Sequence, residues 1–110
     1  MKELPKSTKV VVIGGGVAGT SCAYHLAKFG WKDVVLLERD LLTSGTTWHA
    51  AGLLGQLGAS STITKIRKYS LDLYKDLEKT TGLSTGMKQN GAITVASTKE
   101  RMQELLRQAT

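Results

Sequence analysis

Two short runs of consecutive apolar residues stand near the beginning of the chain, one helix length apart. Residues 9–13 (Lys-Val-Val-Val-Ile) and 33–38 (Asp-Val-Val-Leu-Leu-Glu) are rich in β-branched and aliphatic side chains. Such runs are typical of strands buried on both faces of a parallel sheet. Between them, residues 17–29 carry apolar positions at spacings of three and four, which predicts an amphipathic helix. Strand, helix and strand in this order predict a βαβ unit.

The predicted helix has a candidate core face and a clear end. Ala18, Cys22, Leu26 and Phe29 fall on one side at helical spacing, so we expect this side to pack and Cys22 to be an inert core thiol. Gly30 follows directly, and we expect it to end the helix in a left-handed conformation.

The middle of the chain changes character. Residues 42–61 are rich in Gly, Ser, Thr and Ala and lack clear periodicity, so they predict a long loop with a short helix near residues 50–54. Loops of this length inside a small domain are usually functional or disordered. Residues 62–79 regain helical spacing of apolar positions, and Gly82 is the expected stop signal.

The last third predicts a small hairpin and a helix. Residues 87–89 and 92–96 read as short strands around the turn dipeptide Asn-Gly at residues 90–91. Residues 99–108 predict a final helix that Thr98 caps.

Composition narrows the class of protein. The chain has 110 residues, a formal net charge of +6 and one cysteine, so it allows one domain at most and no internal disulfide framework. No run approaches the roughly 18 apolar residues that span a bilayer, and the short polar start carries no secretory signal pattern. We therefore expect a cytoplasmic protein with no membrane span. Basic residues alternate with acids along the predicted helices, which favours solvated faces over nucleic-acid binding.

A glycine motif joins the first predicted strand to its helix. Residues 14–19 (Gly-Gly-Gly-Val-Ala-Gly) match G-x-G-x-x-G, and Glu38 ends the second strand 19 residues later, near the spacing of a ribose-binding acid. Gly14 would permit the tight turn, Gly16 the approach of a pyrophosphate, and Gly19 close packing of helix and strand. The helix N-terminus would face the phosphates. The motif predicts dinucleotide binding without choosing between NAD and FAD, and a ligand-free βαβ unit is the alternative.

Several longer segments carry a more specific signal than the glycine motif. The most specific is residues 42–53, Leu-Thr-Ser-Gly-Thr-Thr-Trp-His-Ala-Ala-Gly-Leu, and the others are residues 11–16, 24–28, 34–39 and 86–96. Together these segments resemble one family, the FAD-dependent amine oxidoreductases related to D-amino-acid oxidase, in the branch of dimethylglycine and sarcosine dehydrogenases.

The resemblance implies FAD as cofactor and a set of cofactor-binding positions in the glycine turn, after the second strand and in the long loop. These are Gly14, Gly16, Val17, Ala18, Gly19, Glu38, Arg39, Gly45, Thr46, Thr47, Trp48, His49, Ala50, Ala51, Gly52 and Leu53. His49 stands where this branch bonds the 8α-methyl carbon of the flavin covalently. No catalytic or metal-binding residue is expected in the chain.

The fold that the resemblance implies is α/β. Residues 1–61 would form a Rossmann-like FAD-binding βαβ unit with its flavin-contact loop, and residues 62–110 the start of a mixed substrate-domain segment. Members of the family are several times longer, so we expect an incomplete domain, an N-terminal fragment that is inactive alone.

The implied reaction is oxidative demethylation of N-methyl amino acids such as sarcosine or dimethylglycine, by hydride transfer to flavin N5, with a separate electron acceptor. One alternative is a non-catalytic regulatory or relic relative with the same fold. Another is an NAD-dependent dehydrogenase, which would continue as a βαβαβ series after Glu38; the long loop and helix that follow disfavour it.

Overall fold

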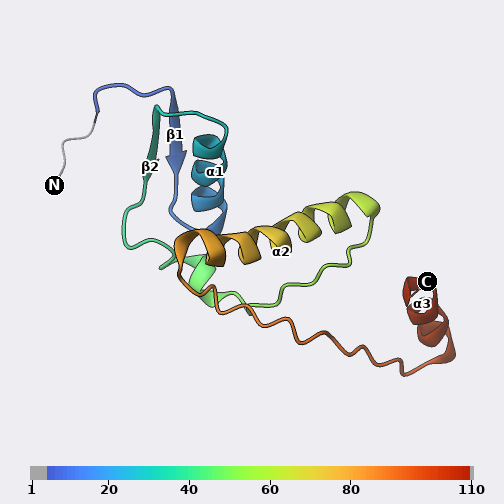
Figure 1. The fold of residues 1–110 in the computed structure, drawn as a ribbon. Coiled ribbons are helices and arrows are strands. Elements are labelled where there is room, and N and C mark those ends of the chain that lie inside the picture. The colour runs from blue at the N-terminus through green and yellow to red at the C-terminus, as the bar shows by residue number, and fades with distance from the viewer. Residues whose placement is uncertain (1–4, 110) are drawn as a thin grey trace. The chain divides into compact units, whose positions relative to one another are not determined.

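The computed structural model describes residues 5–109, and its first part is the expected βαβ unit. Strands β1 (Val10–Ile13) and β2 (Val34–Leu37) pair in parallel, with Val10 opposite Val34 and Ile13 opposite Leu37. Helix α1 (Val17–Lys28) connects them and packs on one face of the pair (Figure 1). The mixed α/β fold class is therefore confirmed, and each strand is shorter than predicted by one residue or two.

Glycines with positive φ form the two turns of this unit. Gly14 has φ 101°, and its N–H donates to the Leu37 carbonyl at 2.8 Å, which continues the ladder just past β1. Gly30 has φ 88° and donates to the Ala27 carbonyl at 3.0 Å, so it ends α1 in the left-handed conformation that the sequence predicts. Non-glycine residues rarely adopt such φ values.

The contact face of α1 differs from the predicted one. A Cβ placed on Gly19 would lie 3.4 Å from the Val12 side chain of β1, so the helix approaches the sheet through this glycine. Ala23 and Leu26 are half-buried on the same side, whereas Cys22 is exposed. The prediction of Cys22 as a core thiol is therefore wrong. The true face is turned by roughly a quarter of a turn from the predicted one, because the smallest residue allows the closest approach.

Residues 38–54 follow β2 as an irregular segment with one short helix. This is the 3-10 helix η1 (Thr46–His49), which lies before the helix expected near residues 50–54. Residues 50–54 have no regular structure, so that expectation is wrong. Thr43 is the one non-glycine residue with positive φ, 67°, among those described.

Helix α2 (Ser61–Thr81) confirms the predicted long helix and extends it at both ends. Ser60 caps its start, because the Ser60 hydroxyl accepts a hydrogen bond from the Ile63 N–H at 3.3 Å. Gly82 ends it with φ 70°, and the Gly82 N–H donates to the Glu78 carbonyl at 3.0 Å.

The predicted hairpin does not form. Residues 83–96 contain no strand, although Gly91 has the positive φ, 79°, that the turn dipeptide favours. Ile93 and Val95 are 95% and 83% exposed. Alternating apolar residues make strands only when a partner strand or a packing surface meets them, and none of the described residues does so here.

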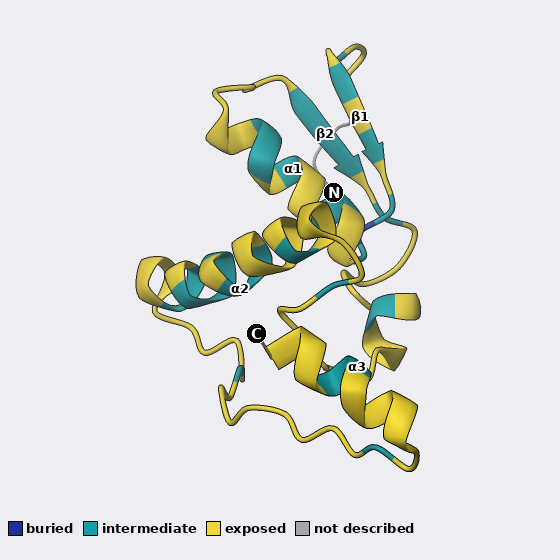
Figure 2. Ribbon diagram, turned by 90° about the vertical axis from the view of Figure 1, so that its right-hand side faces the viewer, coloured by how far each residue is buried: buried dark blue, intermediate teal, exposed yellow. Residues whose placement is uncertain are grey.

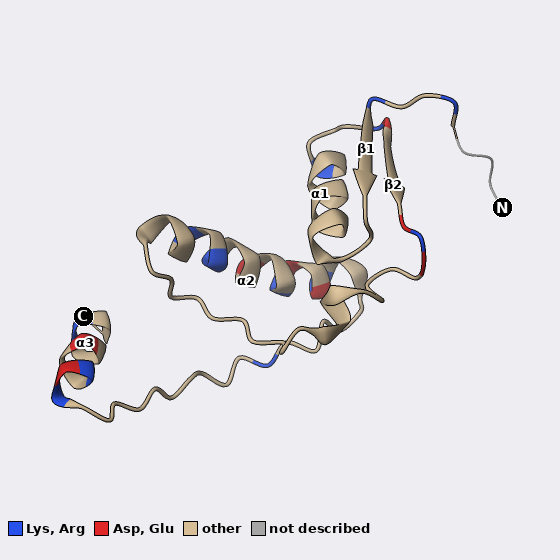
Figure 3. Ribbon diagram, turned by 180° about the vertical axis from the view of Figure 1, so that it is seen from behind, with Lys and Arg blue, Asp and Glu red and all other residues tan. Residues whose placement is uncertain are grey.

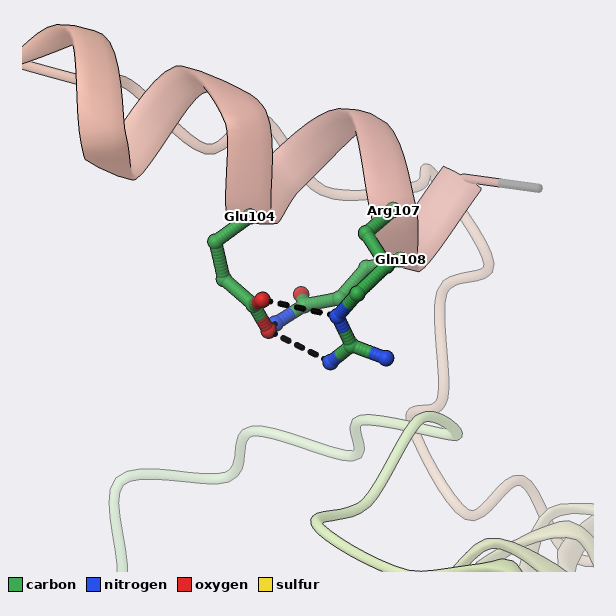
Figure 4. A network of polar contacts seen from close by, with 3 residues as sticks. All are labelled: Glu104, Arg107 and Gln108. Atoms are coloured by element: carbon green, nitrogen blue, oxygen red, sulfur yellow. Dashed lines mark hydrogen bonds and ion pairs between the residues drawn. The ribbon is translucent and has the colours of Figure 1, made fainter.

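Helix α3 (Lys99–Ala109) is the last element, and it confirms the predicted final helix. The Thr98 hydroxyl accepts from the Arg101 N–H at 3.2 Å, as expected of a capping residue. Near its end, Arg107 and Gln108 donate to the Glu104 carboxylate (Figure 4).

The chain divides into two units, Met1–Leu54 and Gly55–Thr110. The domain boundary expected after residue 61 stays a prediction. Most residues of the helices are exposed, whereas three of the four β2 residues are half-buried (Figure 2). Among residues 5–109 only Gly15 is buried. Basic and acidic residues are interspersed along α2 and α3 (Figure 3). Within the described part of the chain, no helix combines the length and the apolar character needed to cross a membrane.

Candidate nucleotide-binding site

The glycine turn between β1 and α1 is closed to side chains at two positions. A Cβ on Gly15 would lie 2.6 Å from Leu42 Cδ2 and 3.1 Å from the Glu38 side chain. A Cβ on Gly19 would overlap the carbonyl oxygen of Gly14. Real Cβ atoms do not approach backbone oxygens so closely, so Gly19 is required by the turn itself, as the sequence motif predicts.

Glu38 holds this turn from the end of β2. Its Oε2 accepts from the Gly15 N–H at 2.6 Å, and its Oε1 accepts from the Asp40 N–H at 3.1 Å. The Gly15 bond, followed by the Asp40 bond, lowers the pKa of Glu38 below its ordinary value, because both stabilise the carboxylate form. The sequence predicts a ribose contact for this acid. The carboxylate can accept the backbone hydrogen bonds and a ribose hydroxyl at the same time, since each oxygen carries a second lone pair.

The first turn of α1 presents backbone donors. The Val17 N–H donates to the Thr47 hydroxyl at 2.8 Å. The N–H groups of Gly16, Ala18 and Gly19 have no acceptor among residues 5–109. A helix N-terminus with open N–H groups and a partial positive charge suits an anion such as a pyrophosphate.

The 38–54 segment lies against the same turn. The Thr43 N–H donates to the Gly15 carbonyl at 3.0 Å, and Thr47 makes the bond to Val17. At the end of η1, His49 is exposed, and its Nδ1 lies 3.1 Å from the Gly45 carbonyl oxygen. Trp48 is 75% exposed, and its ring stands edge-on to that of His49 with centroids 6.4 Å apart.

The glycine turn, Glu38 and the first part of the 38–54 segment surround an open hollow of about 790 Å³. Ten predicted site residues line it: Gly14, Gly16, Val17, Ala18, Glu38, Arg39, Gly45, Thr46, Thr47 and Ala50. The other six predicted residues do not line it: Gly19, Trp48, His49, Ala51, Gly52 and Leu53. The hollow thus brings together the turn, the acid and the start of the loop, and leaves the second half of the loop outside.

Sequence reasoning missed several residues of this site. Ile13, Leu37, Asp40 and Ser44 also line the hollow. The strand ends could have been expected there, because ligands bind beyond the carboxyl ends of parallel strands. Gly15 is a variable position of the motif, yet within the glycine turn only Gly19 leaves less room for an added Cβ.

A parallel βαβ unit whose glycine turn opens a helix, with an acid after the second strand, defines the class: the beginning of a Rossmann-like dinucleotide-binding fold. Comparison with protein families then specifies it. The model of the FAD dependent oxidoreductase (DAO) family matches residues 9–110, and the chain belongs to this family.

Curated relatives agree over nearly the whole chain. A 4-methylaminobutanoate oxidase (formaldehyde-forming) of Paenarthrobacter nicotinovorans is 47% identical over 103 residues, which is 94% of this chain and 12% of the relative. Human mitochondrial sarcosine dehydrogenase is 48% identical over 107 residues, 96% of this chain and 12% of the relative. The mouse mitochondrial pyruvate dehydrogenase phosphatase regulatory subunit is 46% identical over 104 residues, 94% of this chain and 12% of the relative. The chain thus spans about 12% of the length of each of these three relatives.

Proposed function

We propose that residues 14–53 bind FAD as part of a flavin-dependent amine oxidoreductase. The observation that carries this proposal is the placement of an ionised carboxylate, Glu38, and the N-terminus of α1 on one hollow. The carboxylate suits the ribose hydroxyls of an adenosine, and the N–H groups of Gly16 and Ala18 suit a pyrophosphate. Family membership makes FAD the dinucleotide.

The donor set fits this cofactor in a further respect. The backbone must come close to the phosphates at Gly16, where the only atom within 4 Å of an added Cβ is the Thr47 hydroxyl oxygen. Arg39 and Asp40 line the hollow beside Glu38 and would flank the adenosine. Gly45, Thr46 and Ala50 line it from the loop and would extend the contact toward the flavin side.

The proposed reaction is oxidation of an N-methyl amino acid, the chemistry that the names of the sarcosine dehydrogenase and 4-methylaminobutanoate oxidase relatives indicate for those proteins. When bound, FAD would supply the hydride acceptor for oxidation of the carbon beside the substrate nitrogen. This chain's own residues bind and orient the cofactor, and none is assigned to proton transfer. An electron acceptor for the reduced cofactor belongs to the proposal.

His49 is the proposed point of covalent attachment. A carbonyl oxygen can only accept, so the contact with Gly45 places a proton on Nδ1. The neutral ring then keeps its lone pair on Nε2, the atom that would bond the 8α carbon of the flavin. The exposure of His49 leaves this nitrogen open to approach.

A regulatory role is the second candidate, because one relative of similar identity is a regulatory subunit of pyruvate dehydrogenase phosphatase. In that case the same hollow would hold a flavin, or none, without turnover. The residues of the hollow do not separate the two roles, since substrate contacts are not among them.

The deciding experiment uses the protein that carries this chain at its full natural length. A denaturing gel under ultraviolet light shows whether flavin is covalently bound, and a formaldehyde assay with sarcosine, dimethylglycine and 4-methylaminobutanoate measures turnover. We expect fluorescence, loss of that fluorescence in His49→Ala, and formaldehyde from at least one substrate. Flavin without turnover favours the regulatory role. A protein without flavin, or one that binds NAD instead, contradicts the proposal.

Location is part of the proposal as well. The sequence predicts a cytoplasmic protein, whereas the human and mouse relatives are named as mitochondrial proteins. Cell fractionation with an antibody against residues 61–81 tests this directly, and recovery in an organelle fraction would contradict the cytoplasmic prediction.

A further inference from the structure

The loop that carries His49 is tied to the start of α1 by one side chain. The Thr47 hydroxyl accepts from the Val17 N–H at 2.8 Å, across 30 residues of sequence. We infer that Thr47 is a positioning residue: through Val17 it fixes η1, and with it His49, against the glycine turn. This inference rests on the proposed function for its consequence, and on the contacts of the chain alone for its geometry.

The position of His49 depends on this bond because the two residues share one short helix. Thr47 and His49 both lie in η1, and His49 is held to the beginning of that turn by the Gly45 carbonyl at 3.1 Å. The second tie to the glycine turn, from the Thr43 N–H to the Gly15 carbonyl, lies before η1. Without the Thr47 bond, the 44–54 segment has no remaining hydrogen bond to α1 or the turn among the described residues.

Gly16 is matched to this threonine. A Cβ on Gly16 would lie 2.9 Å from Thr47 Oγ1, closer than nearly all real Cβ contacts. No other atom lies within 4 Å of that Cβ. A glycine at position 16 therefore leaves space for the Thr47 hydroxyl as well as for a pyrophosphate. A larger residue at position 16 would displace the Thr47 side chain.

Thr46 provides a matched control beside it. It stands in the same helix and lines the same hollow, yet its hydroxyl makes no hydrogen bond among residues 5–109. An effect that is specific to the bond with Val17 will therefore follow Thr47 and not Thr46.

The first test is amide hydrogen exchange at Val17 in the flavin-free protein at full natural length. Removing one net hydrogen bond in Thr47→Ala should speed exchange at Val17 by about tenfold. Thr47→Ser keeps the acceptor and should restore the slow rate, and Thr46→Ala should leave it unchanged. Equal Val17 exchange in the wild type and Thr47→Ala overturns the inference, whatever the protein does with flavin.

The second test is a double-mutant cycle on melting temperature. Gly16→Ala should lower Tm in the wild-type background and lower it less in the Thr47→Ala background, because the colliding hydroxyl is gone. An equal fall in Tm in both backgrounds would mean that Gly16 and Thr47 are not energetically coupled.

The consequence for the flavin is measured separately. In protein reconstituted with FAD, Thr47→Ala should slow covalent attachment between about 10- and 100-fold, while Thr47→Ser attaches normally. Attachment at the wild-type rate in Thr47→Ala overturns the positioning role. Complete absence of flavin in the wild type instead contradicts the proposed function, and the exchange and melting tests then stand alone.

Discussion

The two units of the chain differ in whether their predicted strands form. In the first unit, β1 and β2 pair over four register positions, and α1 covers one face of the pair. In the second unit, α2 and α3 form as predicted, but the alternating apolar residues of the 83–96 segment do not form strands. Helices close their hydrogen bonds within themselves, whereas a strand needs a partner. Apolar spacing therefore predicts a helix from local sequence, but it predicts a strand only where a partner strand is predicted as well.

Coverage of the first unit is one-sided. Val12 faces α1, while Val11 and Ile13, on the other face of β1, are 49% and 85% exposed. Apolar side chains of a parallel sheet are normally covered on both faces. With one face uncovered, the unit depends on the β1–β2 ladder, on the packing of α1 against both strands, including the close approach at Gly19, and on the hydrogen bonds of the turn.

The largest effect is expected for Gly19→Ala in the first unit. The added Cβ overlaps the Gly14 carbonyl oxygen, so the turn or the helix must move, at a cost of about 1–3 kcal/mol in the free energy of unfolding. Gly55→Ala in the second unit is the control, because a Cβ there meets nothing within 4 Å; it should change stability by less than about 0.5 kcal/mol. Urea unfolding measures both, and equal effects would contradict the role of close packing at Gly19.

Glu38→Gln comes next, since it weakens two backbone hydrogen bonds of the first unit. The pKa of Glu38 is lowered in the folded state, so its stabilising contribution is present above the ordinary value of 4.5 and is lost as the pH falls through the folded-state pKa. We expect the variant to be less stable than the wild type at pH 7, and the gap to close on acidification. Unfolding curves between pH 7 and pH 3 check this, and a gap that stays constant with pH contradicts it.

The sequence predicted most of the first unit because its signals are local. Runs of β-branched residues, a glycine at each turn and an acid at the end of a strand need no knowledge of distant contacts. The packing face of α1 was predicted wrongly because it was assigned from the larger apolar residues, whereas the closest approach to β1 is at the smallest residue, Gly19. The same reasoning, applied to Gly15, would have placed it in the site.

The loop was the harder part of the site. Thr43 and Thr47 join the glycine turn through bonds that span about 30 residues, and nothing in the local pattern of residues 42–54 indicates them. The family resemblance selected the segment as a whole. The structure brings its first half to the hollow, and the role of its second half, including His49, stays a prediction.

Ser60→Ala tests the second unit, where a smaller effect is expected because one capping bond is lost. The Ser60 hydroxyl satisfies the Ile63 N–H, and loss of such a cap typically costs about 1 kcal/mol of helix stability. Amide exchange in the first turn of α2 should therefore quicken by about fivefold. Ser61→Ala is the matched control, since the Ser61 hydroxyl makes no hydrogen bond among the described residues. A similar increase in amide exchange in Ser61→Ala would contradict the capping role of Ser60.

The smallest effect on stability is expected at Glu104 in α3, although its pKa moves furthest. Bonds from Arg107 and Gln108 lower the pKa of Glu104 to about 2, from an ordinary 4.5 (Figure 4). The side chains of Glu104 and Arg107 are 36% and 71% exposed, so water and salt screen the pair and it adds little to stability. The contribution is present above pH 4.5 and is lost as the pH falls toward 2. A titration of the Glu104 carboxyl by NMR should show the low pKa at low salt and a clear rise at about 1 M salt, where the screening length is about 3 Å. A pKa of Glu104 that does not change with salt would contradict this screening. It would mean that the Glu104–Arg107 pair is protected from solvent ions.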